Sequence, residues 1–219
     1  MSTNAGLNAP FELPLYIDFA ATFLWAVSGA LVGARQRFDL AGVAGLALVT
    51  AAGGGILRDG LFIQQGPPRF VQNPAYILIV ALGAAIVLLA GQRVNRMKSF
   101  YTIVSLVDCA ALAAYGIVGM LIARNAGLSL PAAIFIGIVN AVGGGVLRDV
   151  LVGRTPEVFR PGVPTAIAAF ASCLIFLGLT LLLHLGETFA ALIAIGAVFA
   201  LRVAALRYDL RTGPAPGFD

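Results

Sequence analysis

Residues 51–61 read AAGGGILRDGL, and residues 141–151 read AVGGGVLRDVL. At a fixed offset of 90, eight of these eleven positions are identical, including the glycine triplet and the Arg-Asp pair that follows it. The same ungapped offset also pairs Asp18 with Asp108, Gly29 with Gly119 and Pro74 with Pro164. A register that holds over this distance indicates a duplicated unit, so we expect two related halves.

Composition places the chain among membrane proteins. Of its 219 residues, 60% are hydrophobic and 11% are charged, and the mean hydropathy is +0.96, which is far outside soluble globular usage. The net charge of +4 comes from basic residues in short loops, so nucleic-acid binding is not expected. Cys109, Cys173 and His184 lack disulfide or zinc spacing, so we expect buried cysteines, an interfacial histidine and no metal or cofactor.

Seven apolar runs are long enough to cross a bilayer, whose core of about 30 Å needs about 20 helical residues. They are residues 15–34, 40–62, 75–91, 103–123, 131–152, 165–185 and 188–206. The sequence therefore predicts an all-α polytopic protein of the cell (inner) membrane. Ten basic residues of the termini and loops, Arg202 among them, fall on one face, and only Arg69 and Arg124 fall on the other. This asymmetry predicts an N-terminus outside and a C-terminus in the cytoplasm.

The duplication combined with the span count predicts the topology. Each copy holds three spans, an odd number, so the second copy enters the membrane from the opposite side. Inverted repeats of this kind place a permeation or substrate path at the repeat interface. The predicted order is an extracytoplasmic segment 1–14, a first three-helix repeat 15–91, a cytoplasmic linker 92–102, an inverted repeat 103–185, a seventh helix 188–206 and a cytoplasmic tail 207–219.

The two glycine triplets, Gly53, Gly54 and Gly55 with Gly143, Gly144 and Gly145, are costly in a helix interior, at about 1 kcal/mol each relative to alanine. They let a helix open and expose carbonyl oxygens, which membrane proteins tolerate only where protein or water covers the backbone. We predict a functional break at both triplets. The alternative is close helix packing, which small residues also permit.

Charged residues lie inside the apolar runs. By topology we predict two intramembrane ion pairs, Asp18 with Arg58 in the outer leaflet and Asp108 with Arg148 in the inner leaflet. An unpaired charge there costs about 2.5–3.5 kcal/mol on insertion scales, which makes these residues functional candidates. The alternative is that the pairs only lock helices together.

Further polar residues flank these pairs. With Asp59 and Asp149 included, each charged set sums to −1, which favours cations in a low-dielectric wall. Thr50 and Asn140, three residues before each triplet, are suited to replacing part of a cation's hydration shell. The alternative for each is a hydrogen bond to its own helix backbone.

Seven spans arranged as three, three inverted and one, with GGGxxRD in spans two and five, resemble the prokaryotic members of the trimeric intracellular cation (TRIC) channel family. The resemblance covers residues 15–206, and both motif copies are intact. It implies a homotrimer within membrane lipids, a pore in each subunit, and conduction of monovalent cations, chiefly potassium with sodium. It also implies that the six glycines are hinges and that Arg58, Asp59, Arg148 and Asp149 are charged pore partners. The phosphoinositide-binding pattern of the animal members does not occur in this sequence.

No nucleophile elbow, HExxH motif or phosphate-binding loop occurs, so we do not expect an enzyme. The leading hypothesis is a passive cation channel gated at glycine-broken spans two and five. The alternative is a secondary transporter of a small zwitterion such as glycine, with Arg58 or Arg148 holding its carboxylate. Prokaryotic relatives have been catalogued as such transporters. A third hypothesis is a structural membrane protein.

Overall fold

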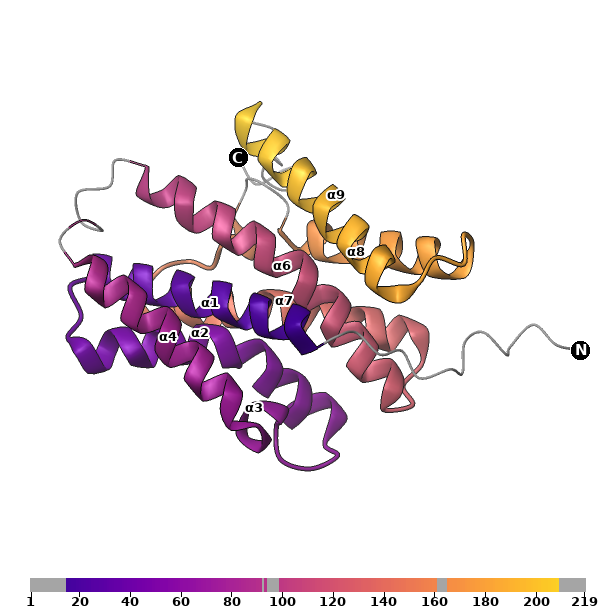
Figure 1. Cartoon of the computed structure of the whole chain (residues 1–219), viewed down its shortest axis with the longest axis horizontal. Coiled ribbons are helices and arrows are strands. Elements are labelled where there is room, and N and C mark those ends of the chain that lie inside the picture. The colour runs from indigo at the N-terminus through magenta and orange to yellow at the C-terminus, as the bar shows by residue number, and fades with distance from the viewer. Residues whose placement is uncertain (1–14, 92, 94–98, 161–164, 209–219) are drawn as a thin grey trace, which may run out of the picture.

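The computed structural model describes residues 15–91, 93, 99–160 and 165–208, and their regular structure is helical (Figure 1). The elements are α1 (Leu15–Arg35), α2 (Leu40–Leu57), the π-helical η2 (Arg58–Ile63), α3 (Arg69–Gln72), α4 (Pro74–Ala90), α6 (Phe100–Asn125), α7 (Leu130–Leu151), the 3-10 turn η3 (Glu157–Phe159), α8 (Thr165–Leu181) and α9 (Glu187–Arg207). The predicted all-α class is confirmed. The predicted segment 1–14 and most of the linker 92–102 and the tail 207–219 lie outside the described residues.

The helices coincide with the seven apolar runs. Five of them, α1, α2 with η2, α6, α7 and α9, are long and apolar enough to cross a membrane, whereas α4 and α8 are apolar but shorter. The prediction of a span over 165–185 was too long, because α8 ends at Leu181. The chain then turns, with His184 at a positive φ of 50° and exposed. Cys109 and Cys173 are buried free thiols, as expected.

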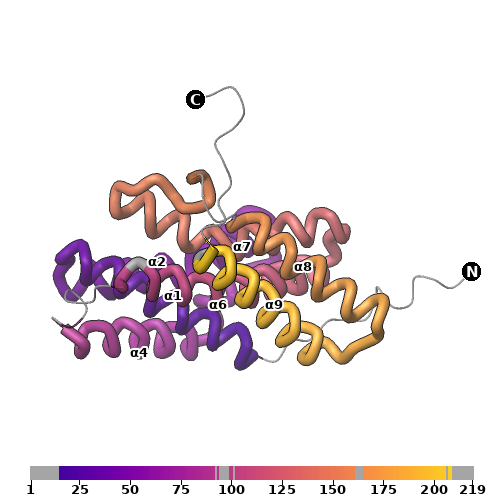
Figure 2. The backbone as a smooth tube through the Cα atoms, turned by 90° about the horizontal axis from the view of Figure 1, so that it is seen from above, coloured from indigo at the N-terminus to yellow at the C-terminus, as the bar shows by residue number. Residues whose placement is uncertain are grey.

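The helices pack as two groups of three with one helix added. In the first group α1, α2 and α4 contact one another, and in the second group α6, α7 and α8 do the same. The groups meet where α2 packs on α7 and α1 packs on α6. Helix α9 packs on α8 and α6, on the side of α6 opposite to α4 (Figure 1), and runs beside α8 (Figure 2).

Backbone bonds at an offset of 90 close the helices of both groups in the same way. After the first helix of each group, Phe38 N–H donates to Gly33 O at 3.1 Å and Leu128 N–H to Ala123 O at 3.2 Å. After the motif helix, Gln64 N–H donates to Asp59 O at 2.9 Å and Arg154 N–H to Asp149 O at 2.8 Å. The duplicated sequence therefore produces duplicated local structure at the ends of both motifs.

Both glycine triplets lie inside continuous α-helix, so the predicted break at the glycines is wrong. The α-helical pattern of α2 runs through Gly53–Gly55 to Leu57, and that of α7 runs through Gly143–Gly145 to Leu151. The pattern of α2 changes only after its triplet, where η2 begins at Arg58 and ends at Ile63, and Gln64 follows with φ 52°. The helix has no need to open, because its own i→i−4 bonds satisfy the peptide groups without water.

The triplets instead bring the backbones of α2 and α7 into contact. A Cβ added at Gly54 would collide with the carbonyl oxygen of Asn140, and one at Gly144 would collide with that of Thr50. Beside them, a Cβ at Gly53 or Gly143 would lie 2.7 or 3.0 Å from a leucine methyl group of the opposite helix. Close packing, the alternative reading of the triplets, is therefore what the structure shows.

This contact predicts that adding a single methyl group at the crossing lowers the stability of the fold. Gly54→Ala should lower the free energy of unfolding by about 1–3 kcal/mol, because the methyl group has to displace the backbone of α7. The measurement is thermal or denaturant unfolding of the purified protein in detergent. Gly45→Ala in the same helix is the matched control, since a Cβ there meets nothing within 4 Å. Equal stability of the two variants would contradict the contact.

Candidate functional site

The two Arg-Asp pairs are buried and fold alike. Arg58 and Arg148 are each 4% exposed. In each pair the arginine Nε donates to the carboxylate of the next residue, at 2.6 Å to Asp59 Oδ1 and at 3.0 Å to Asp149 Oδ1. A charged group in a membrane helix thus finds its counter-charge one residue along the chain, which reduces the cost of burying both.

The second carboxylate oxygen of each motif holds the loop that follows. Asp59 Oδ2 accepts the backbone N–H of Arg69 at 3.0 Å, and Asp149 Oδ2 accepts that of Glu157 at 3.2 Å. Both aspartates are therefore bound on one side by an arginine and on the other by the chain leaving the helix. The geometry fixes both loops to the ends of the crossing helices.

The predicted ion pair between Asp108 and Arg148 is confirmed, and a third residue joins it. Arg148 Nη1 lies 2.8 Å from Asp108 Oδ2 and also donates to Ser28 Oγ at 2.6 Å. Ser28 in turn donates to Asp108 Oδ1 at 2.5 Å. The cluster joins α1, α6 and α7. Ser28 could not be predicted from the repeat, because the residue 90 positions later is the apolar Val118.

The predicted ion pair between Asp18 and Arg58 is wrong. Among the described residues Asp18 accepts instead from Tyr76 Oη at 2.5 Å. Arg58 holds Asp59 through two bonds, and its Nη1 donates to Asn140 Oδ1 at 3.3 Å. The physical reason is that both residues find other partners: Arg58 gives its donors to the two oxygens of Asp59 and to Asn140, and Tyr76 binds Asp18.

Thr50 and Asn140 have different roles although they occupy matching positions. Thr50 Oγ1 donates to Leu46 O at 2.6 Å, which is the local backbone bond that the sequence left open as the alternative. Asn140 instead connects helices, because its Nδ2 donates to Tyr115 O at 2.7 Å while its Oδ1 accepts from Arg58. Both side chains are buried. Asn140 thus links the first motif to the second helix group.

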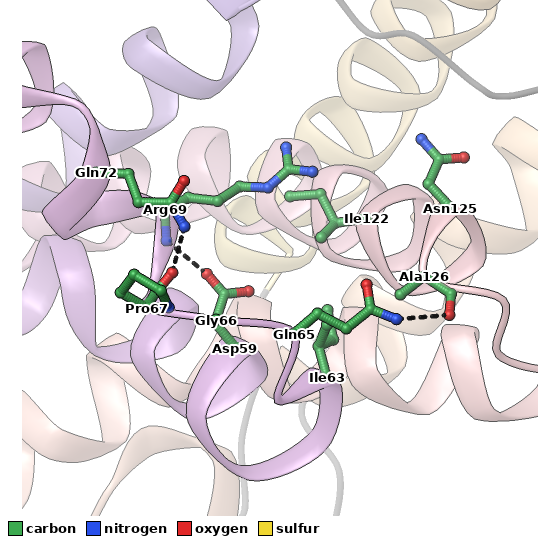
Figure 3. Close-up of a pocket in the computed structure, with 10 residues that line it drawn as sticks. All are labelled: Asp59, Ile63, Gln65, Gly66, Pro67, Arg69, Gln72, Ile122, Asn125 and Ala126. Carbon is green, nitrogen blue, oxygen red and sulfur yellow. Dashed lines mark hydrogen bonds between the residues drawn. The ribbon is translucent and has the colours of Figure 1, made fainter.

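A polar pocket of about 260 Å³ opens beside the first motif (Figure 3). Asp59 lies at its base, and the Arg69 side chain extends across it toward Ile122. Side-chain amides complete the polar lining, namely those of Gln65, Gln72 and Asn125. Gln65 also ties this loop to the end of α6 by donating to Ala126 O at 3.2 Å.

A second pocket, of about 220 Å³, opens beside the second motif. Its charged lining is Asp108, Arg148, Asp149, Arg154, Glu157 and Arg160. Burial raises the pKa of the Glu157 carboxyl above its usual value, and the Arg202 guanidinium partly offsets that rise. The two pockets share no lining residue, so the described residues hold two separate chambers.

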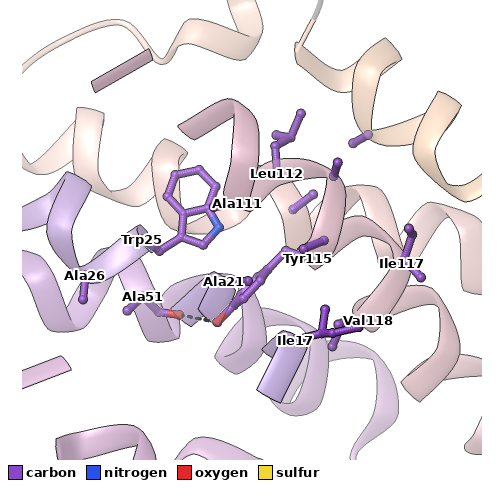
Figure 4. Close-up of a cluster of buried hydrophobic side chains, with 14 of the residues drawn as sticks. Ile17, Ala21, Trp25, Ala26, Ala51, Ala111, Leu112, Tyr115, Ile117 and Val118 are labelled. Carbon is purple, nitrogen blue, oxygen red and sulfur yellow. Dashed lines mark hydrogen bonds between the residues drawn. The ribbon is translucent and has the colours of Figure 1, made fainter. Parts of the chain in front are cut away.

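Aromatic side chains lie in the buried region that includes both helix groups (Figure 4). Tyr115 Oη donates to Ala51 O at 3.1 Å and shares a hydrogen bond of 2.8 Å with Thr22. Trp25 lies 3.5 Å from the position of a Cβ on Gly145 and has an indole N–H without a hydrogen-bond partner among the described residues. Trp25 and Tyr115 are 90 residues apart, a repeat signal that sequence analysis did not use.

Comparison with known proteins agrees with this architecture. A family model described as "Glycine transporter" matches residues 15–92 and 105–181. A UPF0126 membrane protein of Deinococcus radiodurans is 41% identical over 65% of this chain and 65% of its own length, just under two thirds of that relative. The UPF0126 membrane protein YvgT of Bacillus subtilis is 32% identical over 84% of this chain and 88% of its own length.

Solved structures give the same result. The TRIC channel orthologue from Rhodobacter sphaeroides superposes with a TM-score of 0.79 at 28% identity, over 90% of this chain and 98% of that one. A prokaryotic TRIC channel crystallised in 0.5 M KCl gives a TM-score of 0.76 at 26% identity, over 89% and 95%. The resemblance to the TRIC family indicated by the doubled motif is confirmed. The matched structures are ion channels rather than enzymes.

The charge clusters predict that two arginine substitutions lower the free energy of unfolding by different amounts. Arg148→Ala leaves Asp108 and Asp149 buried without their counter-charge, so the free energy of unfolding should fall by about 3–5 kcal/mol. Arg58→Ala strands one carboxylate, that of Asp59, rather than two, and otherwise removes only the hydrogen bond to Asn140, so its cost should be smaller. Unfolding in detergent measures both.

A double substitution is the control for this prediction. Arg148→Ala combined with Asp108→Asn removes one of the stranded charges, so it should recover part of the stability lost in Arg148→Ala. A double variant that is less stable than Arg148→Ala would show that the ion pair is not the source of the loss.

Proposed function

This chain belongs to the membrane-protein family described as "Glycine transporter", and on that premise we propose that it is a monovalent-cation channel with a pore in each subunit. The observation that carries the proposal is the pair of polar chambers, one at each Arg-Asp motif, on either side of the α2–α7 crossing. The likeness to solved structures described as TRIC cation channels supports it. The pore runs from the Asp59 chamber to the Asp149 chamber.

The proposal assigns a topology to the chambers. Residues 15–91 and 103–185 form inverted three-helix repeats, and α9 is the seventh span. The N-terminus lies outside and the C-terminus in the cytoplasm, so the Asp59 chamber is external and the Asp149 chamber is cytoplasmic. Three subunits assemble in the lipid bilayer as a homotrimer. The helix ends matched at an offset of 90 support the repeat, and the basic loops support the orientation.

The charge of the two motif sets beside the chambers supports cation selectivity, with potassium and sodium as the permeant ions. The sets Asp18, Arg58 and Asp59, and Asp108, Arg148 and Asp149, each sum to −1. Carboxylates in a low-dielectric wall raise the local concentration of cations and exclude anions. Asp59 and Asp149 have this role at the chamber ends, and Asn140 provides an uncharged polar group between Arg58 and Tyr115.

The gate lies between the chambers. Opening requires α2 and α7 to shift along their glycine contact, because Gly54 and Gly144 pack directly on the opposite backbone. Such a shift changes the distance between Arg58 and Asn140, whose side-chain hydrogen bond connects the first motif to α7. The moving parts are therefore the glycine contacts at the two triplets, where α2 and α7 slide past each other. The bonds of Arg58 and Arg148 hold the two helices in the closed arrangement.

A transporter of a small zwitterion such as glycine is the second candidate, which the family description favours. The Asp59 chamber has the carboxylate and the guanidinium, of Asp59 and Arg69, that a zwitterion requires. However, Arg58 and Arg148, the expected holders of the substrate carboxylate, are already bound to Asp59, Asp108 and Asp149. A substrate would have to break these buried pairs, so the channel is the stronger proposal.

Planar-bilayer recording decides between the two. Purified protein under asymmetric KCl should give unitary current steps. Their reversal potential should have the sign of the potassium equilibrium potential rather than that of chloride. Asp59→Asn should lower the conductance by about twofold at low salt and less at high salt, because the field of the carboxylate is screened. Asp39→Asn is the matched control, since it changes the same charge at an exposed helix cap that lines neither chamber. Saturable glycine counterflow without unitary currents would establish the transporter instead.

A further inference from the structure

Helix α9 carries a fully buried arginine in its apolar sequence. Arg202 is 1% exposed, whereas its place in the sequence predicted a position on the cytoplasmic face. Its guanidinium donates to Cys109 Sγ of α6 at 3.1 Å, to Thr165 Oγ1 at the start of α8 at 3.2 Å and to Glu157 Oε1 of η3 at 3.2 Å. A buried charge in a membrane helix with several partners is a functional candidate by default.

The acidic partner of Arg202 belongs to the wall of the second chamber. Glu157 lines that chamber, and its side chain is 40% exposed. The backbone N–H of Glu157 donates to Asp149 Oδ2, the oxygen not held by Arg148. A continuous set of contacts thus runs from α9 through Glu157 and Asp149 to the second motif.

The first chamber is built differently at the matching place. There Asp59 Oδ2 accepts the backbone N–H of Arg69, whose side chain is exposed. Among the described residues, no buried arginine of an additional helix reaches that loop. The repeat alone therefore does not account for the charge around the second chamber, because α9 lies outside the repeat and places one cation against the wall residue Glu157.

We propose that Arg202 is a positioning residue of the second chamber, which holds the segment from Asp149 to Glu157 in place and neutralises Glu157 at the chamber wall. Without Arg202 the Glu157 carboxylate would add a negative charge to the permeation path. The effect on current rests on the proposed channel function, whereas the contact between Arg202 and Glu157 is a property of the fold.

Substitutions that neutralise Arg202 or Glu157 test the proposal in planar bilayers. Arg202→Gln should raise the conductance by about twofold at low salt for cations that enter the pore at the Asp149 chamber. The reason is that the Glu157 carboxylate, without its Arg202 partner, attracts cations. Glu157→Gln should lower the conductance, because it removes a negative charge from the chamber wall while the Arg202 guanidinium stays beside it. The double variant should return to the wild-type value, and all differences should shrink at about 1 M salt, where the Debye length is about 3 Å. Arg207→Gln, an equal charge change at the exposed end of α9, is the control and should leave the conductance unchanged.

A purely structural role gives a different result. If Arg202→Gln and Glu157→Gln change the conductance in the same direction, or if the double variant differs from the wild type as much as either single variant does, the neutralising role is overturned. Arg202→Lys keeps the charge and should retain wild-type conductance even if its weaker hydrogen bonding lowers the melting temperature. If Arg202→Gln does not assemble, Arg202→Lys and Glu157→Gln still provide the comparison.

Thermal unfolding tests the contact independently of conduction. The melting-temperature losses of the two single variants should sum to more than the loss of the double variant, because both singles break the same pair. Additive losses would overturn the contact whether or not the protein conducts. Absence of unitary currents from the wild-type protein would refute the channel while leaving this measurement valid.

Discussion

The backbone contact between α2 and α7 is the constraint on which the rest of the structure depends. Gly54 packs on the carbonyl of Asn140 and Gly144 packs on that of Thr50, so each helix is closest to the other in its own triplet. The contact fixes where the Arg-Asp pairs can lie, because each pair follows its triplet by three residues. Arg58 therefore reaches Asn140 across the crossing. Any side chain larger than hydrogen at Gly54 or Gly144 would separate the helices and lengthen that bond.

Electrostatics explains why each motif is an adjacent pair. In hydrocarbon a lone arginine or aspartate is costly, and neighbours in sequence can neutralise each other without help from a distant helix. Arg58 with Asp59 and Arg148 with Asp149 do so in this structure. In each aspartate the Oδ2 oxygen also accepts a backbone N–H of the following loop, which couples the charge pair to the chamber wall. Asp18 is then bound by Tyr76, whereas Asp108 binds Arg148 as well as Ser28.

Much of the fold followed from the sequence, because helix length and apolar composition are local properties. The seven apolar runs became helices, and the offset of 90 identified the motif residues that meet at the centre. What local reasoning missed depends on packing. It could not show that the triplets remain helical, since the same glycines permit both opening and close contact. It also missed Ser28 and Tyr76, which are single polar residues in apolar helices with no counterpart at the repeat offset. The pair of Asp18 with Arg58 failed because Asp59 and Asn140 take the donors of Arg58 while Tyr76 donates to Asp18.

The departures from symmetry are as informative as the repeat itself. Two identical halves would present identical chambers to both sides of a membrane, and a path through them would have no preferred direction. Here Arg58 binds Asn140 of the opposite group, whereas Arg148 binds Asp108 and Ser28. Helix α9 adds Arg202 to one chamber only, through Glu157. Because these differences lie at the chamber walls rather than at the glycine contact, the chamber charges can differ while the crossing that holds the two groups together stays the same.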